Sequence, residues 1–558
     1  MAKKDPTLKE RMLFLVSPEK ANKAYNRRMN EQDAGKENSQ GKRGGSGSPR
    51  MNYGNHGASQ TLNSMVGWIV NGGAAEDEID EHGSTLRQRS RDLFDGGGLA
   101  RSGPLTLTTS VVGWGIHPHP QIDGDYLGMS EEVREETERA ILREWKLWAE
   151  NHFCDAERHK NFYELQDLAF LSMLVSGDVF ALFSMKPNKR TPYQLTVRLL
   201  EADRICTPDS SGDSEIKNLD GGGRIIDGVE INREGEVVKY HIANHHPLAG
   251  SVTEQLEWNS IDAYGSATGE PNILHIMVSE RPEQRRGVPF VAAEIELLKQ
   301  IDRYLKSELT ANLVASMFSV FLESTEDDGV SGLEDVVNED ERVTDDDYHY
   351  ELGPGVVLDL PYGKHVHEVN PTRNNSTFDK YVSAMETVIG SSMTIPKEVL
   401  VKKYESNYTA ARAALLDFWR TVRVYRTRFN ASFNQPIYEQ FLSEAVATGR
   451  IEAPGFFDDP MIRQAWCGCT WMGASMGHVD PLKEVNAAAM RIAQNITTQE
   501  QEASEYNGND WAANVRQRKR ELEALQEFAN LVNKTKNQPS APDDEEDEGE
   551  PEEKEDEE

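Results

Sequence analysis

The sequence predicts an α+β fold, in which helices and strands occupy separate stretches of the chain. Apolar residues recur at helical spacing over residues 130–184, and β-rich segments separated by turn residues follow over 193–279. A single long helical pattern then begins at Pro289. The 558 residues are enough for roughly three or four domains of about 150 residues each.

Residues 1–60 are expected to form a flexible basic arm. Twelve Lys or Arg stand against six Asp or Glu by position 50, and the Gly/Ser-rich stretch GKRGGSGSPRMNYGNHGAS cannot pack a core. Ordered structure is expected from about Leu86. There a polar helical pattern passes through a glycine break into a β-rich run at Ser110 to Ile116.

Two helices within 130–184 and a set of strands are expected next. The helices are indicated by apolar residues three or four positions apart, namely Ile141, Trp145 and Trp148 in the first and Phe162, Leu165, Leu168, Leu171 and Val175 in the second. The strand segments are YQLTVRLLEADRI, GVEINREG, VVKYHIANH and NILHIMVS, with a turn at Asn232 to Gly235.

A long helix from Pro289 to about Met317 would be ~40 Å long at 1.5 Å per residue. It leads through the strand-like MFSVFLES to Thr325–Tyr350, which holds eleven Asp or Glu against one Arg, and to the β pattern GPGVVLDLPYGKHVHEVNP. A second helix from Thr377 to about Met393 leads back. This order indicates a small acidic β module mounted on two struts.

Beyond this insertion the local charge becomes basic. A polar loop over 394–410 precedes a helix with a row of arginines at Arg412, Arg420, Arg423, Arg426 and Arg428. Such a row fits a solvated helix face, an inter-subunit salt-bridge surface or a DNA contact. After Trp466 to Trp471, one helix is expected from about Pro481 to Asn495 and a charged helix from about Glu500 to Asn533.

The net charge of −34 argues at first against a nucleic-acid binder, because DNA affinity comes from Lys and Arg that neutralise phosphates. However, thirteen Asp or Glu and one Lys lie between Asp543 and Glu558, and the stretch at 325–350 adds ten more negative charges. The body of the chain is therefore much closer to neutral. Residues 536–558 are expected to form a disordered acidic tail.

Several classes of site are not supported by the sequence. No apolar run reaches the ~18 residues of a membrane span, and MAKKDPTLKERMLFLVSPEK lacks a secretory cleavage site. No phosphate-cradling loop or H-E-x-x-H motif occurs, so neither a cofactor nor a metal is expected. The four cysteines, Cys154, Cys206, Cys467 and Cys469, are expected to be structural thiols. The two pairs of histidines, His117 with His119 and His365 with His367, are expected to be exposed.

Gly473 to Gly477 matches the G-x-S-x-G pattern of a serine nucleophile, with His478 beside it. A nucleophile elbow needs a strand before Ser475 and a helix directly after it, with the Asp and His partners following in that order. Here Val479-Asp480-Pro481 starts a new turn instead. Catalysis by Ser475 is therefore the weaker interpretation of this segment.

Several stretches, in this order, resemble the lambda family of phage portal proteins. They include LRQRSRDLFDGGGLAR, SVVGWGI, WKLWAENHFCDAERHKNFYELQDLAFLSMLVSGDVF, ERPEQRRGVPFVAAEIELLKQIDRYLKSELTANLVASMFSVF, NYTAARAALLDFWR and VDPLKEVNAAAMRI. The resemblance covers roughly residues 86–492. The chain departs from the family pattern at Asp95-Gly96-Gly97, where the family usually has Asn-Asn-Gly, and its insert at 325–348 is unusually acidic.

The resemblance implies a portal-protein fold that forms a ring, commonly of twelve subunits. Its expected parts are the wing (61–288 and 411–480), two stem helices (289–317 and 377–393), the acidic clip (318–376), the tunnel loop (394–410) and the crown helices (481–535). Within this layout the candidates for transient contact with DNA phosphates are Lys402, Lys403, Tyr404 and Asn407. Arg412, Arg420, Arg423 and Arg426 are candidates for DNA or inter-subunit contact.

The implied function is a non-enzymatic channel at one capsid vertex, which serves DNA packaging, retention, ejection and head–tail joining. The implied partners are further copies of the chain, major capsid or scaffold proteins, the terminase large subunit, head-completion or adaptor proteins, and double-stranded DNA without sequence specificity. No membrane is implied. The protein would be assembled in the host cytoplasm and reside at the portal vertex of the virion. Acidic walls would let the duplex slide, because they repel phosphates.

Two alternatives belong to other classes. One is a phage head-maturation serine hydrolase that uses Ser475, which labelling with a serine-reactive probe would favour. The other is a DNA-binding adaptor whose basic arm and arginine helix hold DNA. Tight, salt-dependent DNA binding by an isolated monomer would support the adaptor.

Overall fold

The computed structural model describes residues 72–208, 216–219, 222–250, 254–316, 320–322, 357–359, 378–404, 408–476, 481–507 and 511–536. The predictions for the basic arm, the acidic stretch at 325–350, the acidic tail, His365, His367, Asn407 and His478 lie outside these residues. The chain divides into two units, residues 1–78 and 79–558. Helix α3 (Ala75–Gly96) begins in the first unit and continues in the second. No described helix is long and apolar enough to cross a membrane.

The predicted β-run at Ser110 to Ile116 is wrong, because α4 (Gly98–Val111) occupies its start and a turn follows. The β-branched residues here are compatible with a helix for two reasons. Leu107 and Val111 lie one turn apart and are fully buried in the core. The buried Thr108 hydroxyl donates to the Pro104 carbonyl at 2.8 Å, one turn back, so its polar group is satisfied within the helix.

The two helices expected within 130–184 are α6 (Glu131–Ala149) and α7 (Phe162–Ser176). A capping box between Asn161 and Glu164 fixes the start of α7. The second helix ends earlier than predicted, because residues 178–185 form a strand. Gly177 makes this break at φ 93°, where an added Cβ would lie 2.6 Å from the Gly287 carbonyl oxygen.

Two antiparallel sheets follow, and four of their eight strands fall on the predicted strand segments. The order β3-β2-β9 joins Leu195–Glu201, Asp178–Met185 and Ile273–Met277. The order β4-β5-β6-β7-β8 joins Ile216–Asn218, Arg224–Ile226, Val229–Ile231, Val237–Ala243 and Trp258–Asp262. Strand β8, WNSID, was not predicted because most of its residues are polar. The main core is rich in aromatic residues: Trp145 makes edge-to-face contacts with Phe162 and Phe441 at centroid distances of 5.0 and 5.1 Å.

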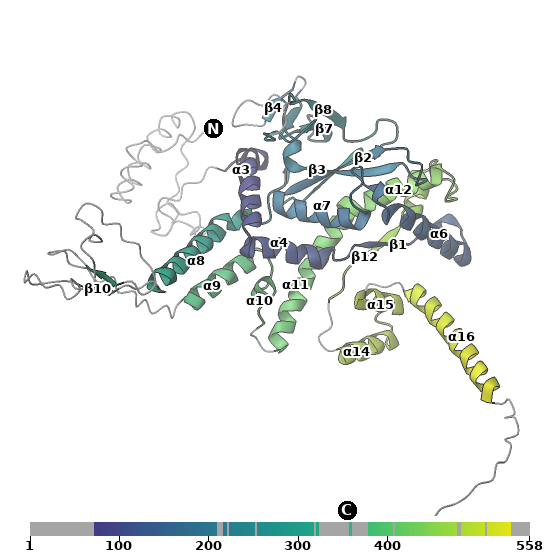
Figure 1. Cartoon of the computed structure of the whole chain (residues 1–558). Helices are drawn as coiled ribbons and strands as arrows, with labels where there is room; N and C mark the ends of the chain where they lie inside the picture. The colour runs from purple at the N-terminus through teal and green to yellow at the C-terminus, as the bar shows by residue number, and fades with distance from the viewer. Residues whose placement is uncertain are drawn as a thin grey trace, which may run out of the picture. The chain divides into compact units, whose positions relative to one another are not determined.

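Two strut-like helices are present, α8 (Ile295–Ser316) and α9 (Phe378–Ser392), and Figure 1 shows them side by side. Tyr304 of α8 contacts the rings of Phe378 and Tyr381 at centroid distances of 5.8 and 4.8 Å. The first helix has 22 residues and is ~33 Å long, because residues 292–294 form a 3₁₀ turn before it. Strand β10 (Val320–Leu322) pairs in parallel with β11 (Val357–Asp359).

The predicted loop at 394–410 contains a short helix, α10 (Lys397–Val401), and α11 begins at its far end (Tyr408–Phe429). Helix α11 continues through one π-helical turn, Asn430–Asn434, into α12 (Gln435–Ala447). Asn434 in that turn is completely buried, and its side-chain carbonyl accepts a hydrogen bond from Gln166 Nε2 at 2.9 Å. The π turn is therefore tied to α7.

Strand β1 (His117–Pro120) pairs antiparallel with β12 (Cys469–Met472). Helix α5 (Gly124–Leu127) follows β1 in the chain, and α13 (Pro460–Trp466) precedes β12. The prediction that His117 and His119 are exposed is wrong. His117 contacts the Tyr163 ring in a tilted arrangement at a centroid distance of 4.3 Å, and burial lowers the His117 pKa. His119 Nε2 lies 2.7 Å from Glu500 Oε1. Pairing in this two-stranded sheet draws both histidines inward.

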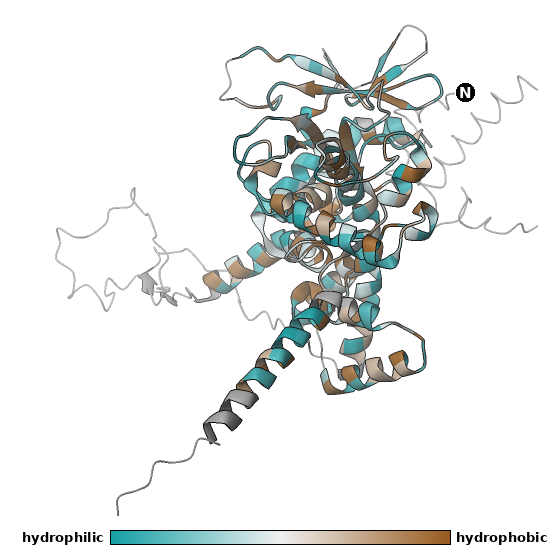
Figure 2. Cartoon of the chain, turned by 90° about the vertical axis from the view of Figure 1, so that its right-hand side faces the viewer, coloured by the Kyte–Doolittle hydropathy of each residue, from teal (hydrophilic) through white to brown (hydrophobic). Residues whose placement is uncertain are grey.

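The C-terminal part has α14 (Pro481–Ala493), then α15 (Gln499–Asn507) and α16 (Trp511–Lys536) in place of one predicted charged helix. Figure 2 shows α16 as mainly hydrophilic, and its described side chains are all exposed. The four cysteines are free, with Cys154 and Cys467 buried, and burial raises the pKa of Cys467 to about 12. This is the environment of inert structural thiols.

Candidate functional site

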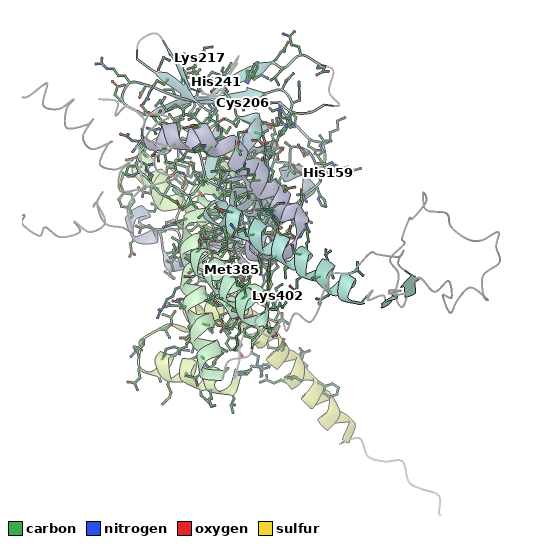
Figure 3. The ribbon with its side chains drawn as sticks, turned by 90° about the vertical axis from the view of Figure 1, so that its left-hand side faces the viewer. His159, Cys206, Lys217, His241, Met385 and Lys402 are labelled. Carbon is green, nitrogen blue, oxygen red and sulfur yellow. The ribbon has the colours of Figure 1, made fainter. Side chains whose placement is uncertain are left out.

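The three described tunnel-loop candidates, Lys402, Lys403 and Tyr404, lie on the turn after α10. All three side chains are exposed, and Tyr404 has 55% of its surface accessible. Lys402, labelled in Figure 3, ends the helix in a left-handed conformation with φ 59°. The structure thus brings these two lysines and the tyrosine together on one exposed turn, while Asn407 is outside the described residues.

Short anchors hold this turn in place. The Ser102 hydroxyl of α4 donates to the Leu400 carbonyl at 2.7 Å, and Leu400 is 1% exposed. Lys397 Nζ lies 3.4 Å from Glu386 Oε2 of α9 and also donates to Ser383 Oγ. An exposed, basic turn is therefore presented from an ordered base formed by α4 and α9.

The four candidate arginines of α11 come together at the wall of one cavity of about 850 Å³. The cavity lies between α11, the segment Trp471–Met476, α14 and α15. Six Lys or Arg and two Glu line it, which leaves an excess of four positive charges in a chain of net charge −34. The charged lining residues are Arg412, Arg420, Arg423, Arg426, Lys483, Arg491, Glu484 and Glu502. Sequence reasoning missed Lys483 and Arg491, which belong to a separate helix.

Both lining glutamates are paired. Arg412 Nη2 lies 3.4 Å from Glu484 Oε1 and so connects α11 with α14. Arg491 forms two hydrogen bonds with the Glu502 carboxylate, at 2.7 and 2.6 Å, and connects α14 with α15. These pairs hold the walls of the cavity together.

Arg426 differs from the rest of the row, because its guanidinium is engaged by the backbone. It donates to the carbonyls of Val111, Ser110 and Ala474 at 2.9, 2.8 and 2.7 Å. Burial, together with the nearby Arg423, lowers its pKa to about 10. At Gly473 an added Cβ would lie 2.9 Å from Arg426 Cζ. Arg426 therefore holds α4 and the 473–476 segment onto α11 through its Nε and Nη2 donors.

Arg420 and Arg423 are the exposed arginines of the row that line the cavity. Arg420 has 83% of its side chain accessible, and its contact with Asp417 one turn away, at 3.8 Å, is weak and solvated. Arg423 is also exposed. Together with Lys483, which is also exposed, these two arginines place positive charge at the solvent-accessible wall of the cavity.

Ser475 lines the same cavity, but its surroundings do not activate a nucleophile. Its hydroxyl donates to the Tyr506 carbonyl at 2.9 Å, and a carbonyl oxygen cannot accept the proton as a base. Ser260 Oγ, by contrast, lies 2.9 Å from His241 Nδ1, and His241 Nε2 lies 2.9 Å from Glu230 Oε2. These three hydrogen-bonded side chains lie on adjacent strands of the five-stranded sheet, where such polar neighbours stabilise the sheet. His241 is labelled in Figure 3.

A cluster of buried charges lies apart from the cavity and was not predicted. Arg286 is completely buried by its surroundings and uses all five N–H groups. Nε and Nη2 donate to Asp178, at 2.7 and 3.3 Å, and the remaining donors reach the carbonyls of Ile205, Asp227 and Ala202 at 2.6–2.8 Å. Burial alone would raise the pKa of Asp178, but Arg286 and His275 hold it well below its usual range.

Arg87 and Arg91 extend the cluster to α3. Arg87 reaches Asp203 at 2.9 Å and Asp227 at 3.2 Å, and Arg91 pairs with Asp203 and Glu201. Donor atoms of Glu201, Asp203 and His246 lie within 4.8 Å of one another, as metal ligands would. However, the arginines already neutralise both carboxylates. We interpret this group as an ion-pair network that binds α3 to the sheets.

Comparison with known proteins gives a consistent family. A family model described as "Phage portal protein, lambda family" matches residues 61–426. The chain is 24% identical over 453 residues to "Portal protein B" of Escherichia phage lambda, covering 78% of this chain and 82% of that protein. It is 22% identical over 477 residues to the "Portal protein" of Escherichia phage N15, covering 82% and 87%.

Solved structures with a similar chain include two from gene transfer agent particles. One is described as the neck of the native particle computed with C12 symmetry, with a TM-score of 0.37, 12% identity and coverage of 78% of this chain and 93% of that chain. The other is described as the virion of the native particle, with a TM-score of 0.36, 13% identity and coverage of 69% and 93%.

Proposed function

Because this chain belongs to the lambda family of phage portal proteins, we propose that it is one subunit of a closed ring that conducts double-stranded DNA at a single capsid vertex. The family match over residues 61–426 is the observation that carries this proposal. The ring would admit DNA during packaging, retain it, release it at ejection and join the head to the tail. Twelve subunits is the number that the family resemblance implies.

The paired helices α8 and α9 support the assignment of a stem. The acidic segment at 318–376, which lies between α8 and α9 in the sequence, is the proposed clip. On α8, Leu305, Leu309 and Leu313 are 43%, 70% and 53% exposed. Exposed leucines on one helix are unfavourable in an isolated subunit, whereas neighbouring copies in a ring would cover them. The remaining parts are proposed as wing (61–288 and 411–480), tunnel loop (394–410) and crown (481–535).

The electrostatics favour sliding over tight binding of DNA. A duplex gains affinity with each phosphate that Lys or Arg neutralises, and a chain of net charge −34 limits that gain. Lys402, Lys403 and Tyr404, with Asn407, are proposed as transient phosphate contacts at the tunnel. The exposed turn that carries the first three residues supports this placement.

The proposed partners and location follow from a portal role. They are further copies of the chain, capsid or scaffold proteins, the terminase large subunit and head-completion or adaptor proteins, at the portal vertex of the virion after assembly in the host cytoplasm. The ring is proposed to have no enzymatic activity of its own. The hydrolase alternative is disfavoured because the Ser475 hydroxyl donates to a backbone carbonyl.

Imaging of the purified full chain, by negative stain together with native mass spectrometry, tests the ring. We expect a closed assembly with a central hole wide enough for a duplex of roughly 20 Å. A stable monomer that binds DNA tightly and with strong salt dependence would contradict the ring. It would favour the DNA-binding adaptor instead.

Replacing Lys402 and Lys403 together by alanine should reduce DNA retention in filled particles without changing ring assembly. Each phosphate contact contributes about 0.9 to the slope of log affinity against log salt, so the salt dependence of retention should also flatten. Nuclease-protected DNA is the measurement. Lys146→Ala, at an exposed position of α6, is the matched control. Equal retention by the double variant and the control would remove these lysines from the channel surface.

A further inference from the structure

The cavity between α11, α14 and α15 requires an explanation that the channel does not supply. It is concave, about 850 Å³ in volume, and is lined by both indole rings and cationic groups. Its four excess positive charges stand out in a chain of net charge −34. We propose that this cavity binds the acidic C-terminal segment of the same chain, Asp543–Glu558, as an internal anionic ligand.

Charge complementarity supports this occupant. The segment reads DDEEDEGEPEEKEDEE, with thirteen Asp or Glu and one Lys. Arg420 and Arg423 present exposed guanidinium groups at the cavity wall, and arginine recognises carboxylates through two parallel hydrogen bonds. No other stretch of this length in the sequence has so high a density of negative charge.

The size and shape of the cavity favour a single extended peptide over duplex DNA. A volume of 850 Å³ lies in the range of pockets that enclose small ligands or short peptide segments. A DNA duplex is roughly 20 Å wide and cannot enter such a pocket, although it could touch its rim. The Arg412–Glu484 and Arg491–Glu502 pairs hold the walls of this cavity together.

The chain is long enough for its end to return to the cavity. Tyr506 lines the cavity, and α16 starts five residues later and has 26 residues, so its far end is at most about 56 Å from Tyr506, about 17 Å for the link and about 39 Å for the helix. The 22 residues from 537 to 558 span up to ~73 Å when extended. Tethering raises the effective concentration of the segment to the millimolar range, which favours intramolecular binding even when the intrinsic affinity is low.

Occupation of the cavity would neutralise the exposed arginines of α11. The body would then present less positive charge to DNA, and the segment would act as a built-in counterion. Binding of the segment in the cavity does not depend on whether the ring conducts DNA. An experiment that contradicts one of these two proposals therefore leaves the other standing.

The test uses a fluorescein-labelled synthetic peptide with the sequence of residues 543–558 and measures its anisotropy at low salt. The proteins are the full chain and a variant that ends at Pro542. We expect the peptide to bind the shortened protein about tenfold more tightly, because the tethered segment competes in the full chain. Equal binding to the two proteins would overturn the proposal.

Charge reversal locates the site. In the shortened protein, Arg420→Glu with Arg423→Glu should weaken peptide binding by about tenfold. Arg428→Glu is the matched control, because Arg428 is exposed on the same helix but does not line the cavity. Circular dichroism checks that each variant is folded. If Arg428→Glu weakened peptide binding as much, only the general charge of the protein would matter. If a short DNA duplex bound more tightly at these arginines and displaced the peptide, the site would be assigned to DNA. Either result would overturn the proposal.

A zero-length carbodiimide coupling in the full chain gives an independent readout. It joins carboxylates to nearby amines, so Lys483 in the cavity wall should couple to residues 543–558. Lys306, which is 72% exposed on α8, should not. Coupling of the acidic segment to lysines of the basic residues 1–50 in place of Lys483 would contradict the assignment.

Discussion

Arg286, in the sheet region, has 2% of its side chain exposed, whereas Arg420, on α11, has 83% exposed. Arg286 donates two of its five N–H groups to the Asp178 carboxylate and the other three to backbone carbonyls, across segments far apart in the chain. Arg420 has one weak contact, 3.8 Å from Asp417 on the same helix. The same side chain type thus serves tertiary structure in one region and a solvent-facing surface in the other.

The difference shows where a change of charge should matter for folding and where it should matter for binding. A buried ion pair contributes little net stability when compared with an apolar replacement, but removal of one partner leaves an uncompensated buried charge. Exposed pairs contribute about 0–1 kcal/mol. Substitutions in the two regions should therefore separate effects on the free energy of unfolding from effects on ligand binding.

The largest effect is expected for Arg286→Met. It strands the buried carboxylates of Asp178 and Asp227 and should lower the free energy of unfolding by about 3–5 kcal/mol, measured by urea denaturation. Arg428→Met, at an exposed position of α11, should change it by no more than about 0.5 kcal/mol. If the Arg286 variant is too unstable to purify, the soluble yield of the two variants gives the same comparison. Comparable stability of both would refute the distinction between the two regions.

An intermediate effect is expected for Arg426→Ala, which belongs to the arginine row but is engaged like a core residue. Its loss leaves the carbonyls of Ser110, Val111 and Ala474 without their donor, which should cost about 1–3 kcal/mol in the free energy of unfolding. Arg423→Ala, three residues away and exposed, should cost about 0.5 kcal/mol or less. A neutral Arg426→Ala would place Arg426 with the solvent-facing arginines.

The smallest effect is a pH dependence from His275, which is buried and lies 3.2 Å from Asp178. Burial lowers its pKa, although Asp178 opposes this. Below about pH 6.5 the unfolded chain takes up a proton that the folded chain does not, so the free energy of unfolding should fall by up to about 1.4 kcal/mol per pH unit from this residue. Asp178, whose pKa is lowered, loses its contribution only below about pH 4.

The contribution of His275 is isolated by comparing the wild type with His275→Gln between about pH 6.5 and 5. The variant should lose part of the slope, while His117, whose pKa is also lowered by burial, keeps its own contribution in both proteins. Identical slopes in the wild type and His275→Gln would contradict the buried, neutral imidazole.

The long amphipathic helices were predictable because their apolar spacing is local information. Trp145 and Trp148 on α6, and Phe162 and Leu165 on α7, are all buried as their spacing indicated. The run at Ser110 to Ile116 was not predictable in this way, since burial of Val111 in the core outweighs the strand preference of β-branched residues. The same limit applies to residues 178–184, where Gly177 breaks the apolar pattern between a helix and a strand.

The arginine row was evident from the sequence, but the different roles of its members were not. Arg420, Arg423 and Arg426 look equivalent along the helix, and only the approach of Ala474 and the α4 carbonyls distinguishes Arg426. The cluster of buried charges could not be predicted from the sequence for a related reason. Asp178 and Arg286 are 108 positions apart, and Arg87 and Asp227 are 140 apart, so no local pattern connects them.

The π-helical turn at Asn430–Asn434 sets the rotational phase between α11 and α12. Such a turn accommodates one residue more than regular α-helix would in the same span, and each residue rotates a helix by about 100°. Deletion of one residue there would turn the arginine side of α11 away from α14 and α15 while α12 remained seated in the core. The π turn therefore lets α11 and α12 form one continuous helical rod whose charged side and aromatic side meet different parts of the molecule.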